Sequence, residues 1–268
     1  IEEAHKRGIE LHAWVNPFRV TSSSSEILTD AQIQNLYKAP TGKTELNPAW
    51  ILKYSNGKFT GTIIDPGIPA AREYITNVLM DIVDHYDIDG ILMDDYFYPY
   101  GGTTTEDATS KSQYKGNDVQ DINNDGKTDD DWRRSNIDAL IKNVYEAIEK
   151  SSNKKHVRFG VGPFGIWTTM ESKAAQAYGI SLPTGIVGQD TYQTLACNPI
   201  EWIKNGYVDY IAPQLYWATS TTGGKQNYGV LCEWWAKLCD SFSNDLSNNK
   251  RVHFYPSHAL YKLYELNE

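Results

Sequence analysis

Short apolar runs alternate with amphipathic segments along the whole chain. The runs predict strands at residues 9–15, 88–94, 156–162, 208–216 and 251–257. The segments before them predict helices at residues 1–8, 69–87, 131–151, 199–205 and 229–245. Helices and strands that alternate in this way are typical of an α/β fold with a parallel sheet.

The predicted strands are apolar on one face only. In the first strand Ala13 and Val15 share one face, because side chains alternate along a strand. His12, Trp14 and Asn16 share the other face. An open sheet covered by helices on both sides would be apolar on both faces. We therefore expect a TIM-type barrel, with helices outside and a polar, aromatic interior.

We expect one barrel domain over residues 1–268 with two insertions. Asn56-Gly57 between two strand-like runs predicts a β-hairpin near residues 50–64. An acidic loop is expected near residues 118–131. A length of 268 residues suits a single α/β barrel, but five strands do not close an eight-stranded one.

Composition excludes some classes of partner. The net charge of −9 argues against nucleic-acid binding, which needs a basic face. No apolar run is long enough to predict a membrane span. We expect no organic cofactor, and nothing indicates an oligomeric state. The 18 Tyr and 8 Trp exceed the 7 Phe, and flat rings with a polar edge suit sugars.

Two adjacent carboxylates, Asp94 and Asp95, end the predicted strand 88–94. Alternation along that strand places Asp94 on the interior face. Adjacent carboxylates repel each other, and the carboxyl ends of strands are where α/β barrels carry their catalytic groups. The pair therefore predicts an active site, although a helix cap or a loop salt bridge would use the same residues.

Seven ordered motifs carry a family resemblance: EAHKRG at 3–8, HAWVNPFR at 12–19, DPG at 65–67, DGILMDDYFYP at 89–99, DWRR at 131–134, PFGIW at 163–167 and DYIAPQLYW at 209–217. Together they resemble glycosyl-hydrolase-like family 10. The resemblance implies a (β/α)8 barrel and glycoside hydrolase activity. It also implies a place outside the cytoplasm, because family members are often secreted or lipid-anchored in bacterial envelopes and some are linked to cell-wall glycans. By the same resemblance, we expect this chain to hold strands three to seven of the barrel.

We predict carboxylate acid/base cleavage of a polysaccharide or oligosaccharide, with a bacterial envelope glycan such as peptidoglycan as one candidate. Asp94 is the first candidate for nucleophile or base. Its partner stays open among Asp95, Asp190, Glu171 and a residue outside this chain, because no acid ends the strand 156–162. Around the carboxylates we expect substrate-binding side chains from His12, Trp14, Asn16, Arg19, Tyr96, Gln214, Tyr216 and Trp217.

The alternative is a non-catalytic carbohydrate-binding protein on a barrel scaffold. The missing acid after strand 156–162 favours it, as does Asn198, which stands where the family resemblance leads us to expect an acid. A metal-dependent deacetylase would need His pairs beside an Asp, and the six histidines form no such cluster in the sequence.

The acidic loop predicts a structural calcium ion. Residues 121–129 match the first nine positions of a calcium loop, with Gly126 at the sharp turn. The predicted ligands are Asp121, Asn123, Asp125, Lys127 (through its carbonyl) and Asp129. Trp132 stands where an acid usually closes the shell, so Asp129, Asp130 or Asp131 would have to do so. A solvated acidic loop without an ion is the alternative.

Overall fold

The protein has an α/β fold around one parallel sheet. A computed structural model describes residues 1–21, 27–36, 46–55, 59–100, 105–169, 173–220, 226–243, 246 and 250–262. The sheet order is β1-β4-β5-β6-β7, so neighbouring strands follow each other along the chain. Its strands are β1 (His12–Val15), β4 (Gly90–Asp94), β5 (Arg158–Gly162), β6 (Tyr210–Ile211) and β7 (His253–Phe254), and every neighbouring pair is parallel. This confirms the expected (β/α) barrel-type arrangement.

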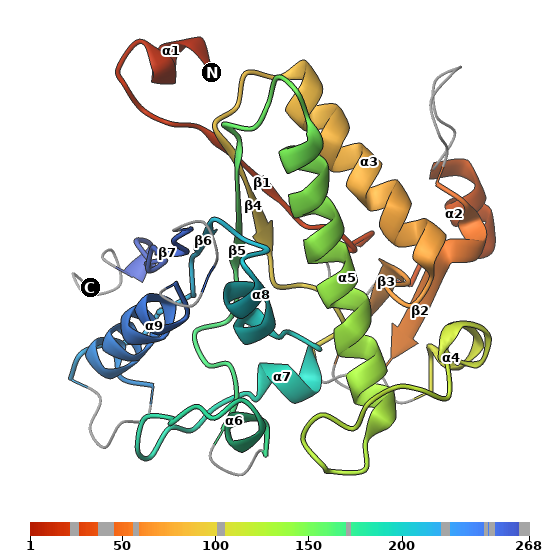
Figure 1. The fold of residues 1–268 in the computed structure, drawn as a ribbon. Coiled ribbons are helices and arrows are strands. Elements are labelled where there is room, and N and C mark those ends of the chain that lie inside the picture. Colours follow the sequence, from red (N-terminus) through yellow and green to blue (C-terminus); the bar gives the residue numbers. More distant parts are fainter. Residues whose placement is uncertain are drawn as a thin grey trace.

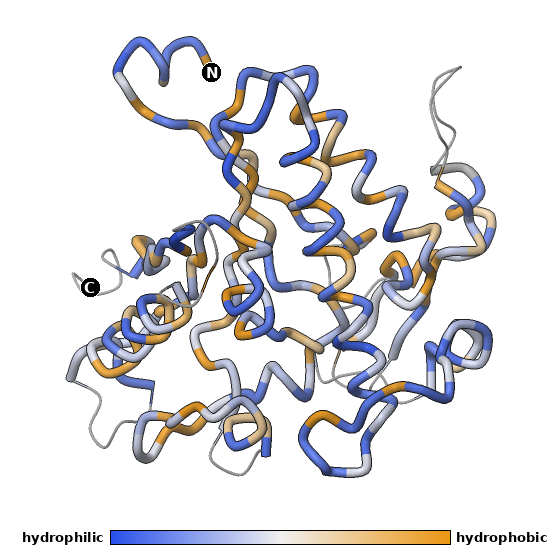
Figure 2. Tube along the Cα trace, viewed as in Figure 1, coloured by the Kyte–Doolittle hydropathy of each residue, from blue (hydrophilic) through white to orange (hydrophobic). Residues whose placement is uncertain are grey.

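Four helices cover one face of the sheet: α3 (Pro69–His85), α5 (Thr128–Lys150), α8 (Pro199–Asn205) and α9 (Tyr228–Ser243). Figure 1 shows α3 and α5 lying side by side along β4 and β5. Their apolar side chains recur every three or four residues, and hydrophobic and hydrophilic stretches alternate along both tubes in Figure 2. None of the helices in the described ranges is both long and apolar enough to span a bilayer.

The predicted sheet faces are confirmed. Val15, Met93, Val161 and Ile211 lie level on neighbouring strands and pack into the core under the helices. On the opposite face, the aromatic rings of Tyr210 and His12 each pack over a glycine of a neighbouring strand. A Cβ atom on Gly160 would approach the Tyr210 ring to 2.2 Å, and one on Gly90 would approach the His12 ring to 2.5 Å.

Strands β6 and β7 are much shorter than expected. Each has two residues, whereas the sequence predicted 208–216 and 251–257. Pro213 has no N–H to donate to a ladder, which interrupts β6. Beyond it the chain stays joined to its neighbours by bridges from Gln214 to Phe164 and Ser257 and by individual hydrogen bonds, such as the Ser257 N–H to the Pro213 carbonyl at 2.9 Å.

The segment 96–130, expected to be a loop, contains helical structure. Helix α4 (Ala108–Tyr114) lies within it, and α5 begins at Thr128, three residues earlier than predicted. Asp129 and Asp131 therefore lie in the first turn of α5, where carboxylates are favoured by the helix dipole. Further short helices are α1 (Glu2–His5), α2 (Asp30–Leu36), a 3-10 turn (Pro48–Trp50), α6 (Ala174–Ala177) and α7 (Thr191–Thr194).

A separate antiparallel pair lies beside the end of β1. It joins β2 (Ile51–Ser55) to β3 (Thr60–Ile64), as expected for a hairpin near 50–64. The predicted turn at Asn56-Gly57 lies outside the described residues. The main chain after β1 runs along β3, with Val20 N–H donating to the Thr62 carbonyl at 3.1 Å. This pairing holds Arg19 opposite Ile63, close to the carboxyl ends of the strands.

Candidate active site

Asp94 and Asp95 lie together at the carboxyl end of β4. Asp94 is the last residue of the strand and is 6% exposed, whereas Asp95 is fully buried at 0%. The Asp95 N–H donates to Asp94 Oδ1 at 2.9 Å, and the charge of Asp94 acts directly on the neighbouring Asp95 carboxyl group. The pair is thus one compact unit rather than two separated groups.

Amide and hydroxyl groups surround this pair. Gln214 Nε2 lies 3.3 Å from Asp94 Oδ1 and 3.0 Å from the Gly162 carbonyl, so it is fixed at both sides. The Asn16 side chain also hydrogen-bonds to Asp94. On the other carboxyl group, the Tyr100 hydroxyl donates to Asp95 Oδ2 at 3.4 Å. These donors favour negative charge on a pair that burial would otherwise neutralise.

The electrostatics of the pair favour one bound proton. Burial raises the pKa of Asp94, opposed by the hydrogen bonds from Asp95 and Asn16 and by the charge of Arg19. Burial and the adjacent Asp94 charge raise the pKa of Asp95 to about 8. Two carboxyl groups in contact cannot both ionise cheaply. Of the two, the fully buried Asp95 holds a proton more strongly, which leaves Asp94 the more readily ionised member of the pair.

Most of the predicted binding residues cluster near the pair. Arg19 lies over the Tyr96 ring, with 4.1 Å from its guanidinium carbon to the ring centroid. The pKa of Tyr216 is raised by burial and then by the charges of Asp94 and Asp95, which places its hydroxyl in their field. Trp217 packs edge-on against Phe164 with 5.4 Å between ring centroids.

His12 and Trp14 lie further down the sheet. His12 is level with Gly90, four residues before Asp94, which corresponds to about 13 Å along a strand. Its Nδ1 hydrogen-bonds the Tyr210 hydroxyl at 2.7 Å, so the structure does not bring His12 to the carboxylates. Trp14 is level with Leu92, on the same face as Asp94 and two residues away, and is 64% exposed.

The other candidates for a second acid have different surroundings. Asp190 caps α7 by accepting from Gln193 N–H at 3.0 Å, and its other oxygen accepts from the Thr168 hydroxyl at 2.8 Å. Glu171 lies outside the described residues. Asn198 is buried and donates to the Tyr178 hydroxyl at 2.8 Å. The sequence analysis missed Tyr100, although the aromatic run after Asp95 could have indicated it.

The predicted calcium loop brings together a different set of residues from the one expected. Carboxylate oxygens of Asp121, Asp125 and Asp131 all lie within 4.8 Å of one another. Asp129 instead binds Lys111 at 2.6 Å and Lys115 at 2.5 Å, because the first turn of α5 points it away from the loop.

The other two predicted ligands of the loop are Lys127 and Asn123, and each makes a hydrogen bond to a nearby residue. The Lys127 carbonyl accepts from Asp130 N–H at 2.9 Å, at the start of α5. Asn123 stays within the loop, with its amide donating to Asp125 at 3.1 Å.

The sequence is similar to known proteins over almost its whole length. The family described as Glycosyl hydrolase-like 10 matches residues 1–263. The chain belongs to this family. It is 35% identical over 265 residues to glycosyl hydrolase YngK of Bacillus subtilis, covering 98% of this chain and 45% of that protein. It is 32% identical over 266 residues to glycosyl hydrolase DigH of Escherichia coli, covering 99% of this chain and 54% of the relative. The chain thus spans about half the length of these relatives.

Proposed function

We propose that this protein is a glycoside hydrolase that cleaves a polysaccharide with Asp94 as the ionised catalytic carboxylate. The observation that carries the proposal is the position of Asp94. It stands at the carboxyl end of a barrel-type strand, on the face opposite the helices, with Asn16 and Gln214 bonded to it. Family membership supports the same reaction class.

Asp95 is better suited to holding Asp94 than to acting across the glycosidic bond. Retaining enzymes separate their two carboxyl groups by about 5–5.5 Å and inverting enzymes by about 6.5–9.5 Å. Asp95 is instead the chain neighbour of Asp94, is fully buried, and donates its N–H to Asp94 Oδ1 at 2.9 Å. We therefore assign Asp95 to positioning and to keeping one proton, and assign the general acid to another carboxyl group, with Glu171 and Asp190 as the candidates to test.

The substrate class follows from the aromatic side chains on the same face. Trp14 and Tyr255 are exposed, and the Arg19 guanidinium packs over the Tyr96 ring. Exposed rings can stack on the apolar faces of sugars while amides such as that of Gln214 bond to their hydroxyls. We infer a glycan polymer as substrate and, within that class, a bacterial envelope glycan met outside the cytoplasm.

The decisive experiment replaces Asp94 by Asn in the whole protein and measures release of reducing ends from glycan polymers. We expect a loss of more than ~10³-fold, as for removal of a catalytic group. Asp87→Asn is the matched control, because Asp87 is an exposed carboxylate just before the same strand. Undiminished activity in Asp94→Asn would refute the assignment.

The general acid can be found by comparing substrates. An enzyme without its general acid should still cleave aryl glycosides whose phenol leaves without protonation, while it fails on natural glycans. Glu171→Gln and Asp190→Asn are tested for this split. If the wild-type protein binds glycans tightly and releases no reducing ends at all, the non-catalytic carbohydrate-binding function is correct instead. Fractionation that finds the whole protein in the cytoplasm would contradict the envelope substrate.

A further inference from the structure

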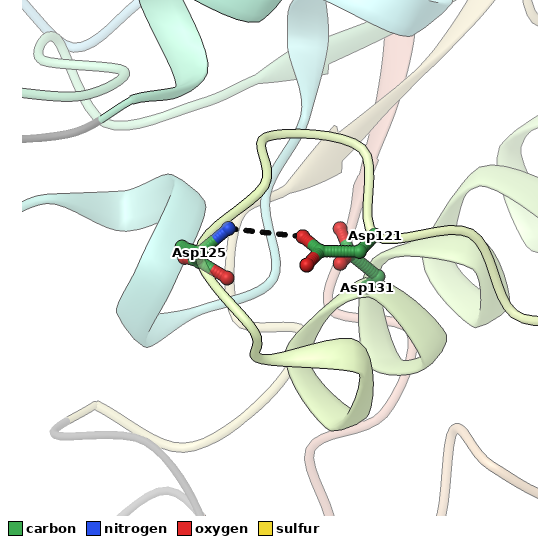
Figure 3. Close-up of side chains that lie close together, drawn as sticks. All are labelled: Asp121, Asp125 and Asp131. Carbon is green, nitrogen blue, oxygen red and sulfur yellow. Dashed lines mark hydrogen bonds between the residues drawn. The ribbon is translucent and has the colours of Figure 1, made fainter.

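Three carboxylates converge where the loop 115–127 meets the first turn of α5. Asp121 and Asp125 come from the loop and Asp131 from the helix, with oxygens within 4.8 Å of one another. Figure 3 shows the carboxylates of Asp121 and Asp131 next to each other, with Asp125 across the loop. Like charges at such distances repel strongly unless something neutralises them.

Two buried oxygens in this cluster lack a partner among the described residues. Asp131 is 1% exposed, and only its Oδ1 is bonded, to Arg134 at 2.7 Å. Its Oδ2 accepts no hydrogen bond. Asn123 is 3% exposed, and its Oδ1 is likewise unbonded. A buried acceptor left without a partner costs about 1–3 kcal/mol, so two in one cluster indicate a missing ligand.

Asn123 can turn its unbonded Oδ1 toward the three carboxylates. Its Nδ2 now donates to Asp125 Oδ2 at 3.1 Å, so the amide group lies against the cluster. A half-turn of the amide exchanges its nitrogen and oxygen and presents Oδ1 beside Asp125. The cluster then offers only oxygen atoms, from three carboxylates and one amide.

We propose that Asp121, Asn123, Asp125 and Asp131 bind a calcium ion. Oxygen ligands select hard cations, and Ca²⁺ accepts irregular shells of 6–8 oxygens that water can complete. Mg²⁺ demands a near-ideal octahedron and keeps most of its own water, which suits this uneven set less well. The site departs from an EF-hand loop. Its closing acid is Asp131, in the first turn of α5, whereas the twelfth position of the loop is Trp132.

The site is connected to the region of the carboxylate pair through side-chain and main-chain contacts. Arg134, which binds Asp131, also donates to the Tyr192 carbonyl at 3.0 Å and lies over the Tyr192 ring. Tyr192 belongs to α7, and Leu195 just after that helix accepts from Tyr98 N–H at 3.4 Å. We expect the ion to fix α5 and α7 in place and thereby steady the segment that follows Asp95. The ion site itself does not depend on the protein being a glycosidase.

Calorimetric titration of the chelator-treated whole protein tests the site, with CaCl2 and MgCl2 as probes. We expect saturable heat from calcium at one site and binding at least tenfold weaker for magnesium. A rise in Tm with calcium should accompany it, because a ligand that binds only the folded state stabilises that state. No calcium heat together with an unchanged Tm would overturn the proposal, and so would equal binding of both ions.

The variant Asp125→Asn tests whether the loop binds calcium or has only a structural role. The variant keeps an oxygen to accept from Lys127 N–H, which now donates to Asp125 Oδ1 at 2.8 Å, but it loses one charge. We expect calcium binding to weaken by about tenfold or more, because ligand charge tunes affinity. Without calcium the variant should melt at or above the wild-type temperature, since one repulsion is gone. Asp118→Asn is the matched control from the exposed part of the same loop and should bind calcium like wild type.

A second variant and a spectroscopic probe cover the case in which Asp125→Asn does not fold. Asp131→Asn can still accept from Arg134 and should likewise weaken calcium binding. Terbium bound at the site should luminesce when the adjacent Trp132 is excited, and calcium should quench that signal by displacement. Equal calcium binding by wild type, Asp125→Asn and Asp131→Asn would refute the ligand assignment.

Discussion

The Tyr210 hydroxyl lies 2.7 Å from Nδ1 of His12, and this hydrogen bond connects β6 to β1 across the two strands between them. The side chains reach each other because glycines stand at the positions they cross. The His12 ring lies over Gly90 of β4, and the Tyr210 ring lies over Gly160 of β5. On this part of the interior face, the His12 and Tyr210 rings therefore pack against the main chain of the neighbouring strands.

Gly160→Ala should destabilise the protein. A Cβ atom at Gly160 would meet the Tyr210 ring at 2.2 Å, so the ring must move and lose its bond to His12. Overpacking of this kind costs about 1–3 kcal/mol, measurable by denaturant unfolding. Gly162→Ala is the matched control on the same strand and face, because its nearest new contact is 3.4 Å away. Equal effects of the two substitutions would contradict this packing.

The fold was largely predictable because side-chain alternation is a local property. The period of two placed Val15 and Met93 on the helix side, and the register confirms that they are level. The extent of β6 was not predictable from apolar residues alone, since Pro213 removes a ladder donor inside an apolar run.

The sequence predicted which side chains lie on the interior face, but it did not predict how far along the strands each of them lies. His12 and Asp94 share the interior face, yet they lie at opposite ends of the strands. Which residues meet in space also depends on where helices begin. The start of α5 at Thr128 turns Asp129 toward lysines and brings Asp131 back to the acidic loop, a contact that linear spacing does not reveal.

Asp107→Asn should be strongly destabilising. Arg133 donates to both oxygens of Asp107, at 2.7 and 2.9 Å, and both side chains are buried. Without the Asp107 charge, the buried guanidinium keeps only the partly exposed Asp130 at 2.7 Å as a carboxylate partner, and losing charge-assisted hydrogen bonds of this kind costs about 1.5–3 kcal/mol. Glu233→Gln, which breaks the exposed pair with Lys237, should leave the Tm unchanged and serves as the control. A loss at Asp107 no larger than that at Glu233 would show that the buried pair contributes little.

Trp14→Ala should weaken substrate binding without affecting stability. The indole is 64% exposed on the same face as Asp94 and two residues from it along the strands, so its loss should change the free energy of unfolding by less than about 0.5 kcal/mol. If it stacks on a sugar ring, KM for a glycan should rise by roughly tenfold, which corresponds to about 1.4 kcal/mol of binding. Tyr86→Ala is the control, because Tyr86 is 55% exposed at the end of α3, far from that face. An unchanged KM for Trp14→Ala would exclude the stacking role.

The stability of the protein should fall as pH rises toward 8, and Asp95 should cause much of that fall. Its pKa is raised to about 8 in the folded state. In an unfolded chain the pKa of an aspartate is about 3.9, as in model peptides. Between about pH 4 and 8 the folded state therefore binds more protons than the unfolded state, so the free energy of unfolding decreases with pH.

Asp95→Asn tests that prediction and the role of Asp95 together. An amide mimics the neutral carboxyl group, so the variant should match the wild type near pH 4 and exceed its stability at pH 8 by at least about 1 kcal/mol in urea unfolding. If Asp95 only positions Asp94, glycan cleavage by the variant should stay within roughly tenfold of the wild type. In the wild type, ionisation of Asp95 at alkaline pH should lower the activity, and this fall should be missing in Asp95→Asn. A collapse of activity as large as that in Asp94→Asn, with aryl glycosides still cleaved, would instead make Asp95 the general acid. Asp87→Asn, which removes an exposed carboxylate, should alter neither pH profile, and this confines the effect to the buried pair.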